Sequence, residues 1–459
     1  MKLPDALLQS LEGIEGFHRE SFVRSHEEAR QVTSIRFNPA KKIAGERKEW
    51  VLDGPIPWSK LGYYLKQRPS FTFDPLFHAG CYYVQEASSM FLEQALKQLL
   101  DLTLPIKVLD LCGAPGGKST HIQSLISPES VLVSNEVIRN RSLVLKDNII
   151  KWGSNNVIVT NNDPKAFQKL KNYFDVLVVD APCSGSGLFR RDEEAIEEWS
   201  VHAVTLCAQR QQRVLADALP SLKEGGLLVY STCSYSKEED ENIADWLKEE
   251  WMMQPESLMI DDSWGIVKSI SSSGSVGYRF YPDLLRGEGF FLSCFRKLSG
   301  EGQQKFRVQA PEKLSASEKK IIEPWLKAEV QFIRNNQGIT ALPPHLLAEC
   351  SILNPLLNIQ YAGVMVGSVM KDRLVPEHSL ALSTIVRDDL PAQELDEETA
   401  IRYLQRQDIN FNSPLRGWQL VRFEGHNLGW VNVLPNRVNN YYPREMRILK
   451  QTRDSSFEK

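Results

Sequence analysis

Short apolar runs alternate with amphipathic segments through the middle of the chain, and this alternation most constrains what the chain can fold into. The runs cover residues 106–113, 130–136, 156–163, 174–180 and 225–234, and a last run at 289–297 can close the sheet. Helix-like segments at 139–152 and 204–222 lie between them. Strands that alternate with helices form a parallel sheet covered on both faces. The sequence therefore predicts an α/β, Rossmann-like, doubly wound sheet.

The length and composition predict several domains and a cytoplasmic location. With 459 residues the chain is too long for one hydrophobic core, while 42% hydrophobic and 24% charged residues are ordinary for a globular protein. A net charge of -4 argues against a uniformly basic nucleic-acid coat but leaves room for local basic patches. The sequence has no signal-peptide core and no long apolar stretch, so we expect no membrane partner.

The seven cysteines are scattered and form no Cys-x-x-Cys pair. We therefore expect free thiols, with neither a disulfide framework nor a metal site. Most of the cysteines fit small buried hydrophobic residues. Cys183 and Cys233 differ, because each lies in a turn of small polar residues directly after an apolar run.

Polar and acidic residues come directly after the predicted strands. In doubly wound sheets, ligands bind outside the carboxyl ends of the strands. The chain places Cys112 there with a glycine-rich turn, followed by Glu136, Asp163 and Asp180. Asp163 taken singly also fits a helix cap. Acidic residues after three successive strands, together with the glycine turn, indicate a ligand site.

The spacing of the glycine-rich turn CGAPGGKST at residues 112–120 distinguishes between several kinds of ligand site. A phosphate-binding P-loop needs a glycine where Cys112 stands, and the G-x-G-x-x-G dinucleotide spacing is absent. Both observations argue against a P-loop NTPase or a dinucleotide site. What remains is a close backbone approach to a nucleoside, with Glu136 at the end of the second strand accepting both ribose hydroxyls.

Three stretches carry a family resemblance. VLDLCGAPGGKST, DAPCSGSG and VYSTCSYSKEEDEN resemble, in order and spacing, the motifs of the Sun-type (NOL/NOP/Sun) RNA cytosine-5 methyltransferases. The resemblance implies S-adenosyl-L-methionine as the cofactor, with an adenine contact at Asp163. It implies cofactor contacts at Cys112, Gly113, Ala114, Pro115, Gly116, Gly117, Lys118, Glu136, Asp163 and Asp180. Gly113 and Ser119 stand where the family usually has alanine and threonine, and neither change removes a functional group.

Two cysteines have a use in such chemistry. A thiolate that adds to C6 of cytosine makes C5 nucleophilic toward the methyl sulfonium, and the adduct must afterwards be released. Spacing does not decide which thiol attacks, and a proline-cysteine after the fourth strand, as in DNA cytosine methyltransferases, favours Cys183. The Sun-type resemblance instead implies Cys233 as the nucleophile and Cys183 as the residue that assists release. Asp180 then holds the cytosine edge or the methionine amine. Lys118 fits either a surface lysine or a role in holding the active-site loops or a phosphate.

The flanking segments are expected to contact RNA. Residues 33–42 with Arg47 and Lys48 combine an apolar run with basic residues and resemble the family's N-terminal module. The tail at 417–448, rich in arginine and aromatic residues, resembles the PUA-like domain of bacterial small-subunit rRNA methyltransferases of the F type, with Trp430 in its core. We expect an N-terminal α+β RNA-binding module at 1–75, the methyltransferase domain at 76–298, a linking α+β domain at 310–385 and a PUA-like RNA-binding domain at 386–459.

The resemblance implies formation of 5-methylcytosine in small-subunit (16S) ribosomal RNA through a covalent adduct. Ribosomal RNA or the small ribosomal subunit is the implied partner, and we expect a monomer. Methylation of tRNA is the nearest alternative, because the catalytic domain alone does not distinguish RNA classes. A non-catalytic RNA-binding factor for ribosome assembly is the alternative from another class, and the intact Cys183, Cys233 and Glu136 argue against it.

Overall fold

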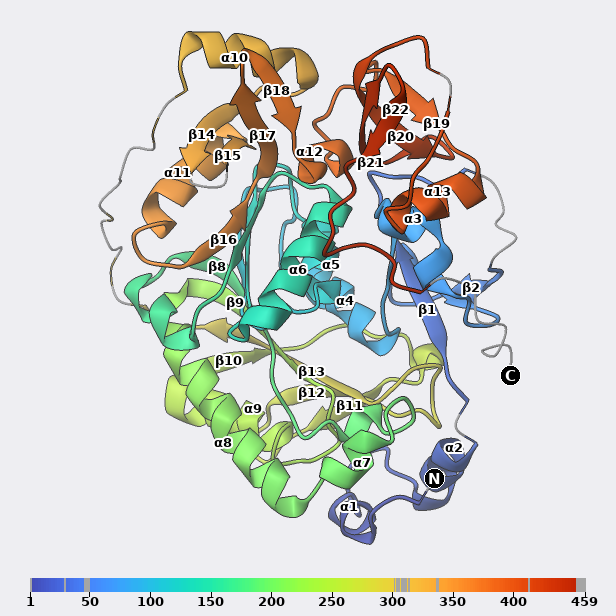
Figure 1. Cartoon of the computed structure of the whole chain (residues 1–459). Helices are drawn as coiled ribbons and strands as arrows, with labels where there is room; N and C mark the ends of the chain where they lie inside the picture. The colour runs from blue at the N-terminus through green and yellow to red at the C-terminus, as the bar shows by residue number, and fades with distance from the viewer. Residues whose placement is uncertain are drawn as a thin grey trace.

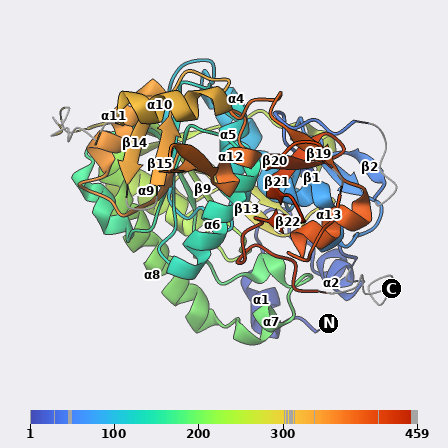
Figure 2. The same cartoon turned by 45° about the horizontal axis from the view of Figure 1, so that its top comes forward.

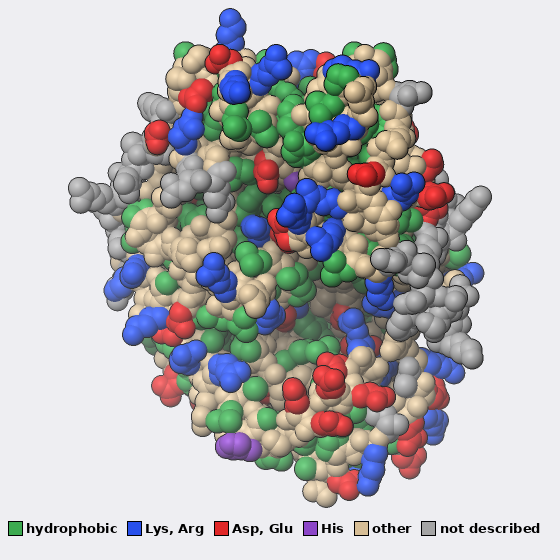
Figure 3. Space-filling model, in the orientation of Figure 1, with side chains coloured by type: hydrophobic (Ala, Val, Ile, Leu, Met, Phe, Trp, Pro, Cys, Tyr) green, Lys and Arg blue, Asp and Glu red, His purple; other side chains and the backbone are tan. Residues whose placement is uncertain are grey.

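The computed structural model describes residues 2–450 except 29, 45–49, 301, 303–305, 307–311, 313, 336–337 and 412. The described residues form a large central sheet, a small sheet from the N-terminal segment and two small sheets from the C-terminal segments (Figure 1). On the face shown in Figure 3, basic side chains lie among acidic and apolar ones rather than forming a uniform coat. No helix in the described part of the chain is long and apolar enough to span a membrane.

The central sheet has a parallel middle and antiparallel sides. Its order is β11-β12-β13-β9-β8-β5-β6-β7-β16, and β10 pairs with β13. The parallel strands are β5 (Lys107–Asp110), β6 (Val131–Asn135), β7 (Val157–Thr160), β8 (Phe174–Asp180) and β9 (Leu222–Thr232). The antiparallel strands are β10 (Met253–Glu256), β11 (Val267–Ile270), β12 (Val276–Phe280), β13 (Phe290–Lys297) and β16 (Ile359–Ala362).

Successive residues of the parallel strands alternate between two buried cores, as the two-residue period of a strand requires. Val108 and Leu132 lie in one core with helices α4 (Leu92–Leu99), α5 (Gly117–Leu125) and α6 (Arg139–Trp152). Leu109 and Val133 lie in the other with η3 (Pro164–Lys169), α8 (Val201–Ala218) and α9 (Glu241–Trp251). Because both faces are covered, these strands are continuous apolar runs rather than alternating ones.

The N-terminal segment adds helices and a second sheet. Helices α1 (Asp5–Ser10) and α2 (Arg19–Glu27) pack through Leu7 and Phe22 against a core that contains Tyr235 and Tyr281. The sheet has the order β2-β3-β1-β4. Its elements are β1 (Thr33–Phe37), β2 (Leu52–Pro55), β3 (Gly62–Leu65), η1 (Phe71–Phe73), α3 (Pro75–His78) and β4 (Tyr82–Val84), followed by η2 (Ser88–Phe91). Arg47 and Lys48 of the predicted basic segment lie outside the described residues.

The C-terminal segments form two sheets, which Figure 2 shows side by side. The first comprises β14 (Gln331–Asn335), β15 (Gly338–Leu342), β17 (Val364–Met370) and β18 (Arg373–Pro376), with helices α10 (Ala316–Ile322), α11 (Pro344–Leu353) and α12 (His378–Leu382). The second comprises β19 (Ala392–Glu394), β20 (Gly417–Phe423), β21 (His426–Leu434) and β22 (Arg437–Asn440), with α13 (Glu397–Leu404). Trp430 is 2% exposed and lies in a core that contains residues of both sheets.

The predicted fold class is confirmed, with differences at both sides of the sheet. All six predicted apolar runs contain strands, and residues 139–152 form α6. The run at 289–297 does not close the sheet, because β12 and β11 follow β13 outward. At the other side, β16 pairs antiparallel with β7, so a strand from beyond residue 310 completes the sheet. The four domain boundaries stay predictions.

Candidate active site

The glycine-rich loop connects the end of β5 to the start of α5. Gly116 directly precedes the helix with a φ of 119°, in the left-handed region that favours glycine. A Cβ on Gly113 would overlap the hydroxyl oxygen of Ser134 on β6. Ser119 donates a hydrogen bond of 2.6 Å to Asp110, and its Oγ lies 2.6 Å from Ser134 Oγ. These contacts fix the loop against the ends of β5 and β6.

Asp110 lies beneath this loop and is fully buried. Burial raises the pKa of its carboxyl to about 7, with the hydrogen bond from Ser119 opposing the rise and the charge of Asp180 adding to it. Its Oδ1 has no hydrogen-bond partner among the described residues. The carboxyl therefore takes up a proton near neutral pH, which lowers the negative charge at this edge.

Glu136 follows β6 and is only 3% exposed. Its Oε1 accepts a hydrogen bond of 2.9 Å from the backbone N–H of Ile138, and its Oε2 lies 3.7 Å from Nη2 of Arg141. The same Nη2 donates to the carbonyl of Ala114 at 3.0 Å, which links the acid to the glycine-rich loop. The sequence does not single out Arg141, because it is one of two arginines in the first turn of α6 and belongs to no motif.

Asp163 follows β7 at the same edge but has a different environment. Its side chain is exposed, and its Oδ1 accepts a hydrogen bond of 3.0 Å from the backbone N–H of Lys165. This bond caps the 3-10 helix η3, so the structure confirms that Asp163 is a helix cap. An additional contact of Asp163 with adenine stays a prediction.

Asp180 ends β8 and forms an ion pair with Lys118, whose Nζ lies 2.8 Å from Oδ2. The hydroxyl of Ser231 donates to Oδ1 at 2.9 Å. Burial opposes the charged form of Lys118, but the charge of Asp180 and the hydrogen bond to it raise the pKa of Lys118 above its ordinary value. Lys118 is 14% exposed and its Nζ lies 5.1 Å from the centroid of the Phe290 ring. It is therefore not a solvated surface lysine.

The turns after β8 and β9 bring Cys183 and Cys233 together, with 3.0 Å between the two sulfur atoms. The hydrogen bond with Cys233 raises the pKa of the Cys183 thiol well above its ordinary value, and burial and the charge of Glu239 add to the rise. Cys183 therefore holds its proton at neutral pH. Strands β8 and β9 pair in parallel, so the turns at their carboxyl ends lie side by side although they are far apart in the sequence.

Glu239 joins the two cysteine turns. Its Oε1 accepts a hydrogen bond of 2.7 Å from the backbone N–H of Ser184, and its Oε2 accepts from the hydroxyls of Ser184 and Ser234 at 2.5 and 2.6 Å. Since Ser184 follows Cys183 and Ser234 follows Cys233, one carboxyl group spans both turns. Burial raises the pKa of Glu239. Sequence analysis gave this residue no role, although it lies in the acidic run after the second cysteine.

The predicted site residues follow five neighbouring parallel strands, in the spatial order β9, β8, β5, β6 and β7. The thiols and the Asp180–Lys118 pair lie at one end of this row, the glycine-rich loop and Glu136 follow, and Asp163 lies at the far end. An elongated ligand can therefore lie along the edge with one end toward the thiols. Among the described residues, no cluster of three or more His, Cys, Asp or Glu side chains could hold a metal ion.

Three family models match the chain. The model for 16S rRNA methyltransferase RsmB/F matches residues 97–296, the N-terminal domain of 16S rRNA methyltransferase RsmF matches 3–87, and the methyltransferase RsmF PUA domain matches 391–448. Ribosomal RNA small subunit methyltransferase F of Aeromonas salmonicida is 31% identical over 422 residues, which cover 86% of this chain and 86% of that protein. The chain belongs to the RsmB/F family.

The chain is also similar in sequence or fold to further known proteins. Ribosomal RNA small subunit methyltransferase F of Shewanella piezotolerans is 30% identical and covers 87% of this chain and 86% of its own length. A solved methyltransferase homolog from Pyrococcus horikoshii is 27% identical, with a TM-score of 0.51 over 64% of this chain and 100% of its own. NSun6 from Pyrococcus horikoshii, solved with SFG, shares the fold at 19% identity, with a TM-score of 0.54 over 64% of this chain and 98% of its own. As an RsmB/F member the chain is a methyltransferase, which confirms the predicted family and enzyme class.

Proposed function

We propose that this chain forms 5-methylcytosine in 16S ribosomal RNA, with S-adenosyl-L-methionine as methyl donor and a transient covalent bond between Cys233 and the cytosine ring. The observation that carries the proposal is the pair of thiols 3.0 Å apart, beside the Asp180–Lys118 ion pair and one strand from the glycine-rich loop. Ribosomal RNA or the small subunit is the proposed partner, and the protein acts as a cytoplasmic monomer.

The residues at the sheet edge fit this cofactor. The loop from Cys112 to Lys118 allows a close backbone approach at its glycines, and the buried Glu136 keeps the capacity of Oε2 to accept ribose hydroxyls. Asp163 is assigned to the adenine amino group and Asp180 to the methionine amine or the cytosine edge. When bound, S-adenosylmethionine supplies an electrophilic methyl sulfonium.

The two thiols have different tasks in the proposed reaction. As the Cys233 thiolate bonds to C6, the C5–C6 double-bond electrons move to C5. C5 would then take the methyl group of the bound sulfonium, whose methyl–sulfur bond electrons stay on sulfur, so that S-adenosylhomocysteine is the leaving group. The C5 proton then leaves to solvent, the double bond reforms and the sulfur–C6 bond breaks. Cys183, which its raised pKa keeps protonated, donates a proton to the departing sulfur 3.0 Å away, and the thiolate left on Cys183 takes a proton back from solvent.

Lys118 supports the nucleophile electrostatically. The charges of Lys118 and of a Cys233 thiolate interact, and Asp180 holds the ammonium group in place. A nearby fixed cation stabilises a thiolate, which is the reactive form of cysteine. Asp180 at the end of β8 thus positions the cation that stabilises the thiolate after β9.

The test is methyl transfer from methyl-labelled S-adenosylmethionine to 16S rRNA, naked or in the small subunit, followed by digestion to nucleosides. The proposal expects label in 5-methylcytidine with wild type and with Cys207→Ala, a cysteine of α8 outside the site, and none with Cys233→Ala. Label in tRNA alone would move the substrate to tRNA. No label in any RNA would leave an RNA-binding assembly factor.

A further inference from the structure

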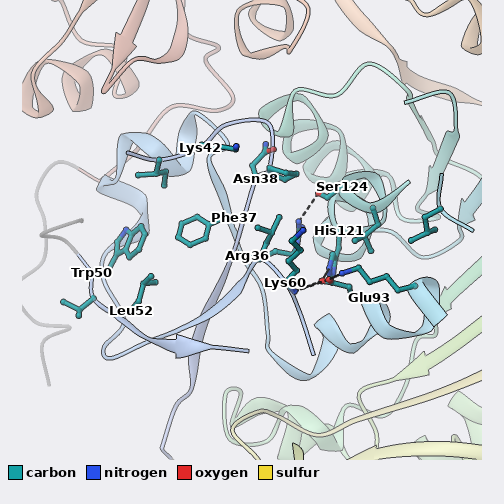
Figure 4. Close-up of a pocket in the computed structure, with 17 residues that line it drawn as sticks. Arg36, Phe37, Asn38, Lys42, Trp50, Leu52, Lys60, Glu93, His121 and Ser124 are labelled. Carbon is teal, nitrogen blue, oxygen red and sulfur yellow. Dashed lines mark hydrogen bonds and ion pairs between the residues drawn. The ribbon is translucent and has the colours of Figure 1, made fainter. Parts of the chain in front are cut away.

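A cavity of about 990 Å³ lies between the N-terminal sheet and helices α4 and α5 (Figure 4), and none of its described lining residues is assigned to the proposed reaction. Its size is at the upper end of ordinary ligand sites, which span roughly 300–1,000 Å³. Figure 4 shows Phe37, Trp50 and Leu52 on one side of the cavity and Glu93, His121 and Ser124 on the other. The proposed function gives this cavity no role.

One wall of the cavity is aromatic and apolar. The rings of Phe37 and Trp50 lie 5.9 Å apart between centroids, and Leu52 beside them is 38% exposed. Leu102 and Leu125 line the cavity from the methyltransferase domain. Aromatic and apolar walls of this kind receive flat, aromatic ligands, and unpaired nucleobases stack on aromatic side chains regardless of their sequence.

The charged lining is predominantly positive. Among the described residues, Arg36, Lys42, Lys60 and Lys97 line the cavity, against the single carboxylate of Glu93. Glu93 is already engaged, since it accepts hydrogen bonds from the hydroxyl of Ser59 and from the backbone N–H of Lys60 and pairs with Lys97. In the described part of the chain, no ion pair engages the ammonium groups of Lys42 and Lys60, and both residues are exposed. The cavity therefore favours an anionic ligand.

His121 at the cavity is a buried ring with one nitrogen that has no partner among the described residues. His121 Nε2 lies 3.0 Å from Glu93 Oε2, and burial lowers the pKa of His121 to about 4, so the ring is neutral and Nε2 carries the proton. Nδ1 is then an acceptor, and it has no hydrogen-bond partner among the described residues.

Arg36 connects the cavity to the helix that begins at the glycine-rich loop. Its guanidinium donates to the carbonyl of Gly117 at 3.2 Å and to the hydroxyl of Thr120 at 2.6 Å, both on α5. Its Nε donates to Gln85 at 2.8 Å, so the group is fixed on both sides. A ligand in the cavity would therefore rest against the same helix that carries Lys118.

We propose that this cavity receives one unpaired nucleotide of the RNA substrate, with the base against the wall of Phe37 and Trp50 and its phosphate near Lys42 and Lys60. The proposal deepens the proposed function, and rests on it in taking RNA as the substrate. An aromatic wall beside Lys42 and Lys60, whose ammonium groups have no ion-pair partner among the described residues, matches a base joined to a phosphate. The nucleotide is one that flanks the target, because the thiols lie at the carboxyl ends of β8 and β9 while the cavity lies on α4 and α5.

The test is binding of a fluorescent oligouridine to the full chain without cofactor, measured against salt. Oligouridine contains no cytosine, so the result does not depend on methyl transfer or on the thiols. The charge variant is Lys42→Ala/Lys60→Ala, with Lys268→Ala/Lys320→Ala as its control. The cavity-filling variant is Leu102→Trp, and its control is Leu104→Trp, a 56% exposed residue of the same turn that does not line the cavity. Thermal unfolding checks that each variant is folded.

The proposal expects the lysine pair to lose about tenfold in affinity and about 1.4 in the slope of log affinity against log salt, which is the change for two phosphate contacts on a single strand. Leu102→Trp should lose about tenfold with an unchanged slope, because it displaces a base rather than a charge. The proposal is overturned if Leu102→Trp and Leu104→Trp bind equally well, or if both lysine pairs lose the same affinity. Equal losses for a duplex of the same length would also overturn it, since a paired base cannot enter the cavity.

Discussion

Helix α5 separates two regions that the chain builds in different ways. Its first residues, Gly117 and Lys118, belong to the reacting edge of the sheet, and its later residues, His121, Ser124 and Leu125, line the cavity. The reacting edge collects contiguous motifs that each follow a strand, whereas the cavity collects side chains from residues 36–43, 50–61, 93–102 and 121–125. A parallel sheet thus assembles a site through its topology, while a site between two domains depends on how they pack.

The first prediction concerns the reacting edge, where we expect a large loss of methyl-transfer rate on substitution of Glu239. Glu239→Ala removes the carboxyl that ties both cysteine turns, and a displacement of about 1 Å at reacting groups can cost about 10²-fold in rate, so kcat should fall by about 10² to 10³. Glu239→Gln should recover part of the loss, because an amide still makes some of these bonds. The measurement is single-turnover methyl transfer.

The exposed neighbour Glu238 supplies the control for this experiment. Glu238→Ala should keep the wild-type rate, and oligouridine binding should be the same in all three proteins. A normal rate in Glu239→Ala would show that the turns hold the thiols in place without it.

A smaller loss is expected at the ion pair of the reacting edge. Lys118→Met removes the cation beside Asp180 and Cys233, and loss of one electrostatic group at a reacting centre costs about 10² in kcat. Lys118→Arg keeps the charge and should retain more activity than Lys118→Met. Equal rates in the two variants would argue that the charge is not what matters. Steady-state kinetics with saturating cofactor distinguishes the cases.

The two acids assigned to the cofactor should differ from each other. Glu136→Gln alters a buried acceptor and should raise KM for the cofactor about tenfold, which is about 1.4 kcal/mol. Asp163→Asn should raise it only about threefold, because Asp163 is exposed and asparagine can also cap η3. Kinetics against cofactor concentration measures both. A larger effect at Asp163 would place the main polar contact at β7 instead of β6.

The two regions should respond to acid with opposite signs. The folded pKa of Asp110 is raised to about 7, so its contribution to stability is full below its unfolded pKa and is lost as pH rises to 7. The folded pKa of His121 is lowered to about 4, so its contribution is full above its unfolded pKa of 6.5 and is lost as pH falls toward 4. Between about pH 4 and 6.5, lowering the pH therefore increases the contribution of Asp110 to the free energy of unfolding and decreases that of His121.

Urea unfolding of variants between pH 4.5 and 6.5 measures this difference. Relative to wild type, Asp110→Asn should make the loss of unfolding free energy on acidification steeper, and His121→Gln should make it shallower, each by up to about 1.4 kcal/mol per pH unit. Parallel curves for the two variants would show that neither group titrates as its burial requires.

The sequence predicts the reacting edge better than its surroundings, for physical reasons visible in particular residues. Cys112, Glu136 and Asp180 follow apolar runs that have no other use than buried strands, so their place at one edge follows from the fold class. Glu239 could not be singled out from the sequence, because an acidic residue within an acidic run is usually solvated. Only the structure shows that the hydroxyls of Ser184 and Ser234 donate hydrogen bonds to it. The prediction that the run at 289–297 closes the sheet is wrong, because β12 and β11 lie outside β13.

The remaining misses depend on contacts between distant segments. Strand β16 pairs with β7 across some two hundred residues, and the cavity combines Phe37 with His121 and Leu102. No local period or turn chemistry encodes such pairings. From the sequence His121 fits a packed or solvated histidine, and the structure shows a buried ring. Its hydrogen bond with Glu93 depends on how helices α4 and α5 pack, which the sequence does not indicate.

The most direct test of the proposed division of labour between the thiols is the covalent adduct itself. Wild type, Cys183→Ala and Cys233→Ala are incubated with cofactor and 16S rRNA, and protein–RNA complexes that survive denaturation are counted on a gel. The account predicts no adduct and no methyl transfer for Cys233→Ala, and accumulation of adduct for Cys183→Ala, because the proton donor for release is gone. Adduct that accumulates in Cys233→Ala instead would contradict the account and exchange the roles of the two cysteines.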